Sequence, residues 1–194
     1  MQSLLPDARK VDALATLSTG LGEDERVAQV LKAWQSPGCL ARFCFIAGQN
    51  QREKFAEWQT VESLTRRYGL TRYDGLIVQP SAEHTRHQAE WVCEQVVHTG
   101  ATSVAVYAPH YHLLRAWLTF VQEIVFRNNL WIPVLPVQVI VSPFDTLREY
   151  EPEVVAKWEL IAGEFARIRT YTAKGDVANF SDAFRYIEWL WKNC

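Results

Sequence analysis

Histidine and arginine side chains gather in two short stretches of this sequence, and both stretches lie where an apolar run passes into a helical pattern. One stretch carries His84 and His87, and the other carries His110, His112 and Arg115. Histidine exchanges a proton near neutral pH, whereas arginine stays charged and can hold a phosphate or carboxylate through two parallel hydrogen bonds. These residue types indicate an anion-binding site in which His112 or His110 could act as a general acid or base.

The spacing of His112 and Arg115 is that of neighbours on one helix face. Residues at positions i and i+3 of a helix lie on the same side, so we expect both side chains to point to one place. Together they would form a cationic pocket that binds an anion more tightly as the pH falls through the titration of the histidine. The alternative role for Arg115 is a salt bridge to a neighbouring helix.

The histidine spacings also permit a metal site. His84 and His87 form an H-x-x-H pair, His110 and His112 form an H-x-H pair, and zinc binds imidazole nitrogens. No Asp or Cys stands at a convincing spacing from either pair, and isolated histidines often cap helices or make single hydrogen bonds. We therefore expect no metal and assign the histidines to proton transfer or anion binding.

Apolar runs and helical periods alternate around these stretches. They predict five strands near residues 11–17, 42–47, 75–79, 103–108 and 134–140, and helices near 23–35, 52–68, 85–98 and 110–126. Gly69 and Gly100 are stop signals for two of the helices. Prolines in the last run mark a sheet edge or a strand start. The alternation is typical of a three-layer α/β/α fold with a mainly parallel five-stranded sheet.

In a parallel sheet every loop that leads from a strand to a helix lies at the carboxyl edge, where open α/β sheets bind ligands. The two histidine stretches should meet there with the glycine loops. Gly20 and Gly22 could bring backbone N–H groups to a phosphate or simply form a tight turn, and Gly48 has the same two roles open. Ser81 and Thr85 are further candidate ligand residues, with helix capping as their alternative.

The last quarter of the chain departs from this alternation. Residues 142–151 are expected to form a linker, and helices are expected near 152–169 and 180–192, with tryptophans among their apolar residues. We expect a single domain over 1–194, with an α/β core at 11–140 and a helical extension at 142–194. A rival to the ligand-binding hypothesis is a non-catalytic sensor or partner-binding module that uses the tryptophan-rich helices as its interface.

Composition excludes some classes of protein. The chain has 194 residues, is 48% hydrophobic and carries a formal net charge of -2, so no basic field points to nucleic acid. The four cysteines suit neither a disulfide framework nor a cysteine-based zinc site, which favours a reducing compartment. No signal peptide or membrane-spanning run is apparent. We therefore expect a cytoplasmic protein, and its oligomeric state stays open.

Together these residues resemble the YdcF/SanA-like family, also called the DUF218 domain, over about residues 11–140. The core of its signature stands here as Tyr111-His112-x-x-Arg115-Ala116. Ser81, Thr85 and Ala89 match an upstream polar segment of the family, while the family's Asn, Glu and Asn positions hold His84, His87 and Gln88. Arg26 resembles the early helix arginine of the family, and Gly48 resembles the first glycine of its Ser-Gly-Gly turn.

The resemblance implies a Rossmann-like fold with its pocket at these loops, which adds Arg26 and Tyr111 to the candidate ligand-binding residues. It also implies a nucleotide-like ligand such as S-adenosylmethionine and a link to bacterial envelope processes. The leading hypothesis is a domain that binds a small anionic metabolite, nucleotide-like or phosphorylated. Hydrolysis or transfer at phosphorus or at an activated carbon would be its chemistry if it is an enzyme.

Overall fold

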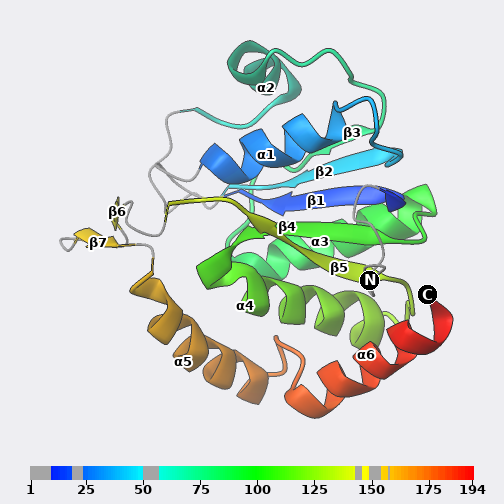
Figure 1. Ribbon diagram of the computed structural model, residues 1–194, viewed down its shortest axis with the longest axis vertical. Helices are drawn as coiled ribbons and strands as arrows, with labels where there is room; N and C mark the ends of the chain where they lie inside the picture. The colour runs from blue at the N-terminus through cyan, green and yellow to red at the C-terminus, as the bar shows by residue number, and fades with distance from the viewer. Residues whose placement is uncertain (1–9, 19–23, 50–56, 143–145, 149–153, 157) are drawn as a thin grey trace, which may run out of the picture.

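The computed structural model describes residues 10–18, 24–49, 57–142, 146–148, 154–156 and 158–194. Its centre is a five-stranded parallel sheet with the strand order β3-β2-β1-β4-β5 (Figure 1). The strands are β1 (Ala13–Leu17), β2 (Phe43–Ala47), β3 (Leu76–Val78), β4 (Val104–Pro109) and β5 (Val134–Val139). The predicted fold class is confirmed as a Rossmann-like three-layer α/β/α fold, and the proline-containing β5 is an edge strand.

The central strands β1, β2 and β4 are buried on both faces of the sheet, which explains why they are continuous apolar runs. Ala15 and Leu17 of β1 belong to one apolar core, while Leu14 belongs to the other, because successive side chains of a strand point to opposite faces. The helices α1 (Asp24–Trp34) and α2 (Val61–Tyr68) cover one face. The helices α3 (Thr85–Thr99) and α4 (His110–Phe120) cover the other (Figure 1).

The helix α2 begins later than the sequence pattern predicts. Residues 57–60 are not helical, so the prediction was wrong there, and residues 52–56 lie outside the described part of the chain. Thr60 sets the start as an N-cap, because its hydroxyl accepts a hydrogen bond from the Ser63 N–H while the Ser63 hydroxyl accepts one from the Thr60 N–H. The predicted stops at Gly69 and Gly100 are confirmed, with φ angles of 60° and 66°.

The chain after His110 does not remain one α-helix to Phe126. It changes at Val121 into a π-helix, η2 (Val121–Arg127). The predicted helix near 152–169 is also wrong at its start, because β7 (Val154–Ala156) pairs antiparallel with β6 (Thr146–Arg148). Helix α5 (Leu160–Ala173) begins only afterwards, and α6 (Phe180–Asn193) ends the chain close to its predicted position.

The two C-terminal helices pack outside α4 and join the core of the sheet (Figure 1). Ile168 of α5 and Leu190 of α6 belong to the same apolar core as β4 and α4. The Tyr186 hydroxyl donates a hydrogen bond to the Ile132 carbonyl at 2.8 Å and accepts one from the Val134 N–H at 2.6 Å. Burial raises the pKa of Tyr186, so this hydroxyl keeps its proton and ties α6 to the edge strand.

The sequence also led to expectations about disulfide bonds and about membrane-spanning helices. All four cysteines are free thiols, as their spacing predicted. In the part of the chain that the structure describes, every helix is too short or too polar to cross a lipid bilayer.

Candidate functional site

The strand order of the sheet reverses between β1 and β4. These strands are neighbours, although β2 and β3 lie between them in the sequence, and the Thr16 hydroxyl donates to the Tyr107 carbonyl at 3.3 Å. Ligands of open α/β sheets bind outside the carboxyl ends of strands at such a reversal. At this point β4 passes directly into α4, whose N-cap is Pro109, a residue with no side-chain acceptor for the first turn. The amino end of α4 therefore presents backbone N–H groups to an anion.

Three buried side chains meet beside this helix end. Arg26 of α1 is 3% exposed, Tyr111 is 7% exposed and His112 is 5% exposed. The Arg26 guanidinium reaches both neighbours, with Nη1 3.1 Å from His112 Nδ1 and Nη2 donating to the Tyr111 hydroxyl at 3.1 Å. The structure thus brings together Arg26 of α1 with Tyr111 and His112 of α4, from helices on opposite faces of the sheet (Figure 1).

The contact with Arg26 determines the protonation of His112. Arginine only donates hydrogen bonds, so His112 Nδ1 must accept, and the hydrogen of the neutral ring then lies on Nε2. Burial, followed by the charges of Arg115, Arg26 and Arg167, holds the pKa of His112 well below its usual value of 6.5. His112 is therefore neutral near pH 7, and the expectation that it changes charge near neutrality is not met in this environment.

The Nε2 atom of His112 is buried and has no hydrogen-bond partner among the described residues. A buried donor without a partner is unusual, since more than nine tenths of such groups are satisfied in folded proteins. The Nε2–H of His112 could therefore donate a hydrogen bond to a ligand oxygen without breaking an existing one.

Arg115 forms a salt bridge to a neighbouring helix, which is the alternative role considered for it from the sequence. Its guanidinium makes a two-pronged salt bridge with Glu164 of α5, with Nε on Oε2 and Nη2 on Oε1 at 3.1 Å. The side chains of Arg115 and Glu164 are 13% and 8% exposed. Arg115 Nη1 also donates to the Thr85 hydroxyl at 3.1 Å, and Arg167 Nη1 donates to Glu164 Oε1 at 2.9 Å. Arg115 therefore ties α4 to α5 and to the start of α3.

A buried amide fixes the ends of the strands beside this site. Gln88 Nε2 donates to the carbonyls of Ser18 at 2.8 Å and Gly48 at 2.7 Å, which follow β1 and β2. Gly48 is also needed for a close approach of two backbones, because a Cβ atom there would lie 2.5 Å from the carbonyl carbon of Ser81. The presence of glycine at position 48 is therefore explained by its close packing against the backbone of Ser81.

His84, His87 and His110, the other candidate histidines, lie at the same edge. His84, and not Thr85 or Ser81, is the N-cap of α3, with Nδ1 accepting the His87 N–H at 3.2 Å. Burial and the neighbouring His87 lower the pKa of His84. His110 is half-buried, and its ring centroid lies 5.5 Å from that of Tyr111.

The convergence of loops expected from the sequence is found where the structure describes them. Thr85 and Arg115 join the two histidine stretches, and Gln88 joins the turn at Gly48 to the end of β1. The candidates Gly20 and Gly22 lie outside the described residues.

Sequence reasoning missed Glu164, which completes the arginine cluster from the C-terminal extension. A signal was present, because Leu160, Glu164 and Ile168 are the buried residues of α5 at helical spacing. A charged residue in an apolar helical stripe indicates a buried ion pair. Gln59 was missed as well; its side chain bonds to the Ser18 hydroxyl, and its N–H donates to Gln49 Oε1 at 2.9 Å.

Comparison of the chain with protein-family models, curated proteins and solved structures finds no match. The resemblance to the YdcF/SanA-like family thus rests on the sequence motif alone. The motif residues Tyr111, His112 and Arg115 lie together at the amino end of α4, and conclusions about the site come from this geometry.

Proposed function

We propose that the chain binds a small anionic metabolite, nucleotide-like or phosphorylated, at the carboxyl ends of β1 and β4. The observation that carries the proposal is the buried Nε2 of His112, which lacks a hydrogen-bond partner among the described residues and stands close to the charges of Arg26, Arg115 and Arg167. A neutral donor surrounded by guanidinium groups is suited to the oxygen atoms of a phosphate or carboxylate.

Energetics support an anion over a neutral ligand. Leaving a buried donor unsatisfied costs about 1–3 kcal/mol, and a hydrogen bond to a charged acceptor contributes about 1.5–3 kcal/mol. A charged ligand oxygen that accepts a hydrogen bond from His112 Nε2 removes the cost of the unsatisfied donor and contributes the stronger hydrogen bond. Backbone N–H groups at the start of α4 add an electrostatic attraction of the same sign.

The roles of the histidines then differ. His112 donates a hydrogen bond and, since its only lone pair accepts from Arg26, it does not act as a general base at neutral pH. Any proton transfer in hydrolysis or group transfer would fall to His110. S-adenosylmethionine is among the first compounds to test, because the resemblance to the YdcF/SanA-like family implies a nucleotide-like ligand, and membership of that family is itself part of this proposal.

The test is direct ligand identification followed by titration. Native mass spectrometry of the purified chain reports any co-purified small molecule. Calorimetric titration then compares S-adenosylmethionine, ATP, a sugar phosphate and inorganic phosphate in buffer that contains EDTA. We expect Arg26→Lys, which keeps the charge but loses the two-pronged reach to Tyr111 and His112, to weaken binding about tenfold or more, or about 1.4 kcal/mol.

Arg42→Ala is the matched control, because Arg42 precedes β2 at the opposite edge of the sheet and its side chain is 57% exposed. It should bind the anion as the wild type does. Equal affinity of wild type and Arg26→Lys, or no binding of any anion in the panel, would contradict the proposed site.

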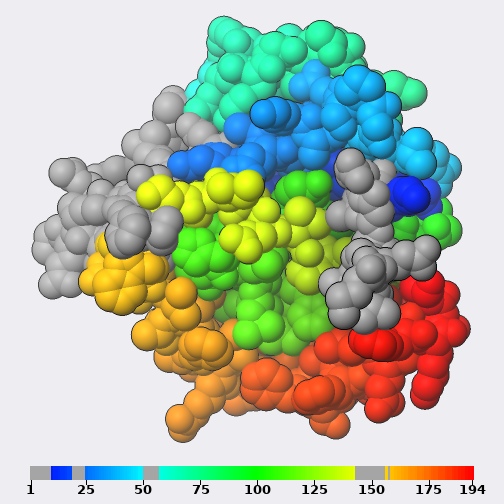
Figure 2. Space-filling view, in the orientation of Figure 1, coloured from blue at the N-terminus to red at the C-terminus, as the bar shows by residue number. Residues whose placement is uncertain are grey.

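A second candidate function has its own supporting observation, a stripe of exposed apolar residues on the C-terminal helices. Phe184 and Trp191 of α6 are 68% and 66% exposed. With Phe180 and Ile187 they recur at i, i+4, i+7 and i+11, which places them on one side of the helix. Trp158, Ile161 and Phe165 form a similar exposed row at α5. Figure 2 shows α5 and α6 one after the other along the lower margin of the molecule.

We propose a second copy of this chain as the occupant of the α6 stripe. The four residues of the α6 stripe leave on the order of 500 Å² uncovered, which is about what one partner contributes to an interface at the small end of the size range.

Sedimentation of the wild type and of Phe184→Asp tests the second candidate. A concentration-dependent dimer that Phe184→Asp abolishes is the expected result. A monomer at all concentrations, or association that Phe184→Asp leaves intact, would overturn it.

A further inference from the structure

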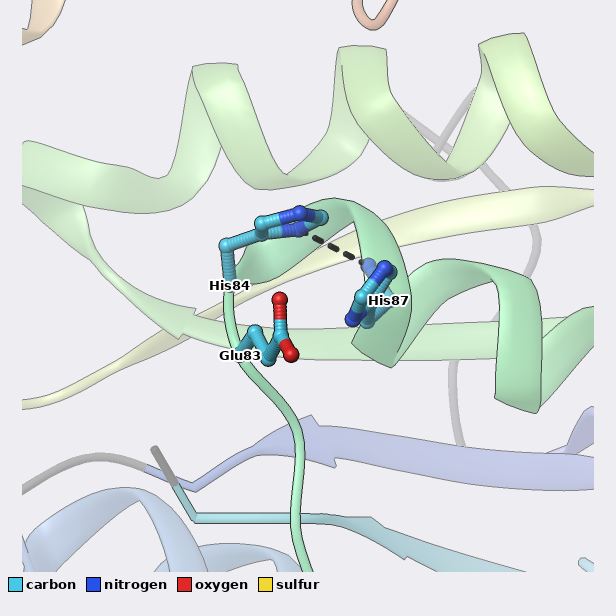
Figure 3. A group of neighbouring side chains, drawn as sticks. All are labelled: Glu83, His84 and His87. Atoms are coloured by element: carbon cyan, nitrogen blue, oxygen red, sulfur yellow. Dashed lines mark hydrogen bonds between the residues drawn. The ribbon is translucent and has the colours of Figure 1, made fainter. Parts of the chain in front are cut away.

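Glu83, His84 and His87 form a compact group of potential metal ligands at the start of α3. One ligand atom from each residue lies within 4.8 Å of the others. The ring centroids of the two histidines are 4.0 Å apart. Figure 3 shows the carboxylate of Glu83 pointing toward the space between the two rings. His110 and His112, the H-x-H pair of the sequence, are not part of this group.

We propose that Glu83, His84 and His87 bind a divalent transition-metal ion of the zinc type. Two imidazole nitrogens and one carboxylate oxygen are a donor set that zinc accepts, at about 2.0–2.2 Å per ligand. Ligand atoms within 4.8 Å of one another reach that geometry by side-chain rotation. Three protein ligands leave a position for water or a ligand. This site goes beyond the proposed anion function and does not depend on it.

The residues differ in how strongly they are held. Glu83 and His84 are exposed and His87 is half-buried, so the two outer side chains can adjust while His87 stays on the first turn of α3. A metal can also enter from solvent without any movement of the core. The next residue, Thr85, accepts the hydrogen bond from Arg115 Nη1 at 3.1 Å, which places the group beside the arginine cluster.

Metal binding competes with the cap of α3 for one lone pair. His84 Nδ1 accepts the His87 N–H at 3.2 Å, and a neutral imidazole has only one nitrogen lone pair in its plane. A metal on Nδ1 replaces the cap directly. A metal on Nε2 moves the ring hydrogen to Nδ1, which can then no longer accept. The ion therefore releases the capping bond in either case.

Because His84 has both a capping role and a proposed ligand role, a substitution can separate the two. His84→Asn keeps a good N-cap for α3 but removes the imidazole. His87→Ala and Glu83→Gln remove the other ligands without touching the capping side chain. His98→Ala is the matched control, because His98 is an exposed histidine in the last turn of the same helix.

The experiment is calorimetric titration of the full chain with Zn²⁺ after treatment with EDTA and removal of the chelator. We expect one zinc ion per chain in the wild type and in His98→Ala. His84→Asn and His87→Ala should each bind at least tenfold more weakly, while their melting temperatures without metal stay close to that of the wild type. Titration with Co²⁺, followed by visible absorption, reports the coordination geometry.

No saturable zinc binding in the wild type would overturn the proposal, and so would equal affinity in His84→Asn, His87→Ala and the wild type. If His87→Ala does not fold, His87→Gln replaces it in the same comparison. Because the anion titrations contain EDTA, a failure of the metal site leaves the test of the anion site unaffected.

Discussion

The burial of a neutral histidine makes the stability of this protein depend on pH in a defined direction. In the unfolded chain His112 titrates near its ordinary pKa of 6.5, whereas burial and three nearby guanidinium groups hold its pKa well below that value in the folded state. Below pH 6.5 the unfolded state therefore binds a proton that the folded state does not. The free energy of unfolding falls as the pH drops, by up to about 1.4 kcal/mol per pH unit, until the folded-state pKa is reached.

The perturbation that isolates this effect is His112→Gln. Its amide oxygen can still accept from Arg26, but the side chain does not titrate. Between pH 7.5 and 5.5 the wild type should lose about 1.4 kcal/mol more than the variant. For a chain of this size that difference is about 3–6 °C in melting temperature.

The assay is thermal or urea unfolding of both proteins at several pH values, with the change from pH 7.5 to 5.5 compared between them. Other titrating groups contribute to both proteins and cancel in the comparison. NMR titration of the His112 ring is an independent check. An equal loss of stability in wild type and His112→Gln would refute the conclusion that His112 is held neutral.

Three further outcomes test the contacts that position the site. Arg115→Met should lower stability by about 3 kcal/mol because it strips Glu164 of its two-pronged partner, and the double variant Arg115→Met/Glu164→Leu should recover part of that loss in urea unfolding. Gly48→Ala should cost about 1–3 kcal/mol or more, since the new Cβ meets the Ser81 backbone; a melting temperature equal to that of the wild type would contradict this. Tyr186→Phe should cost about 1–3 kcal/mol by removing two hydrogen bonds at β5, which faster hydrogen exchange of that strand would confirm.

The strands could be predicted because their signal is local. A sheet buried on both faces requires continuous apolar runs, and turns such as those at Gly69 and Gly100 separate the elements. Two element boundaries were predicted wrongly because they depend on contacts that the hydrophobic pattern of the segment itself does not show. The start of α2 depends on the reciprocal bonds of Thr60 and Ser63, and the strand Val154–Ala156 exists through pairing with Thr146–Arg148.

That the candidate residues of the two histidine stretches lie close together could be predicted from the sequence more readily than the contacts that they make. The motif around His112 and the strand-to-helix rule together indicate the carboxyl edge. The charge of His112 could not be predicted, because it follows from burial and from Arg26, which is 86 residues away in the chain. The partner of Arg115 was likewise hidden, since Glu164 comes from a helix in the C-terminal extension.

The pairing of β1 with β4 has a consequence for the order of folding during synthesis. The hydrogen bond between Thr16 and Tyr107 joins residues 91 positions apart. At about 5–20 residues per second, β4 is synthesised roughly 5–18 seconds after β1. Until then β1 can pair only with β2, and its other edge is an apolar strand open to incorrect partners. The buried contacts of Arg26 with Tyr111 and His112 therefore form late, because they require β4 and the start of α4 to have been synthesised.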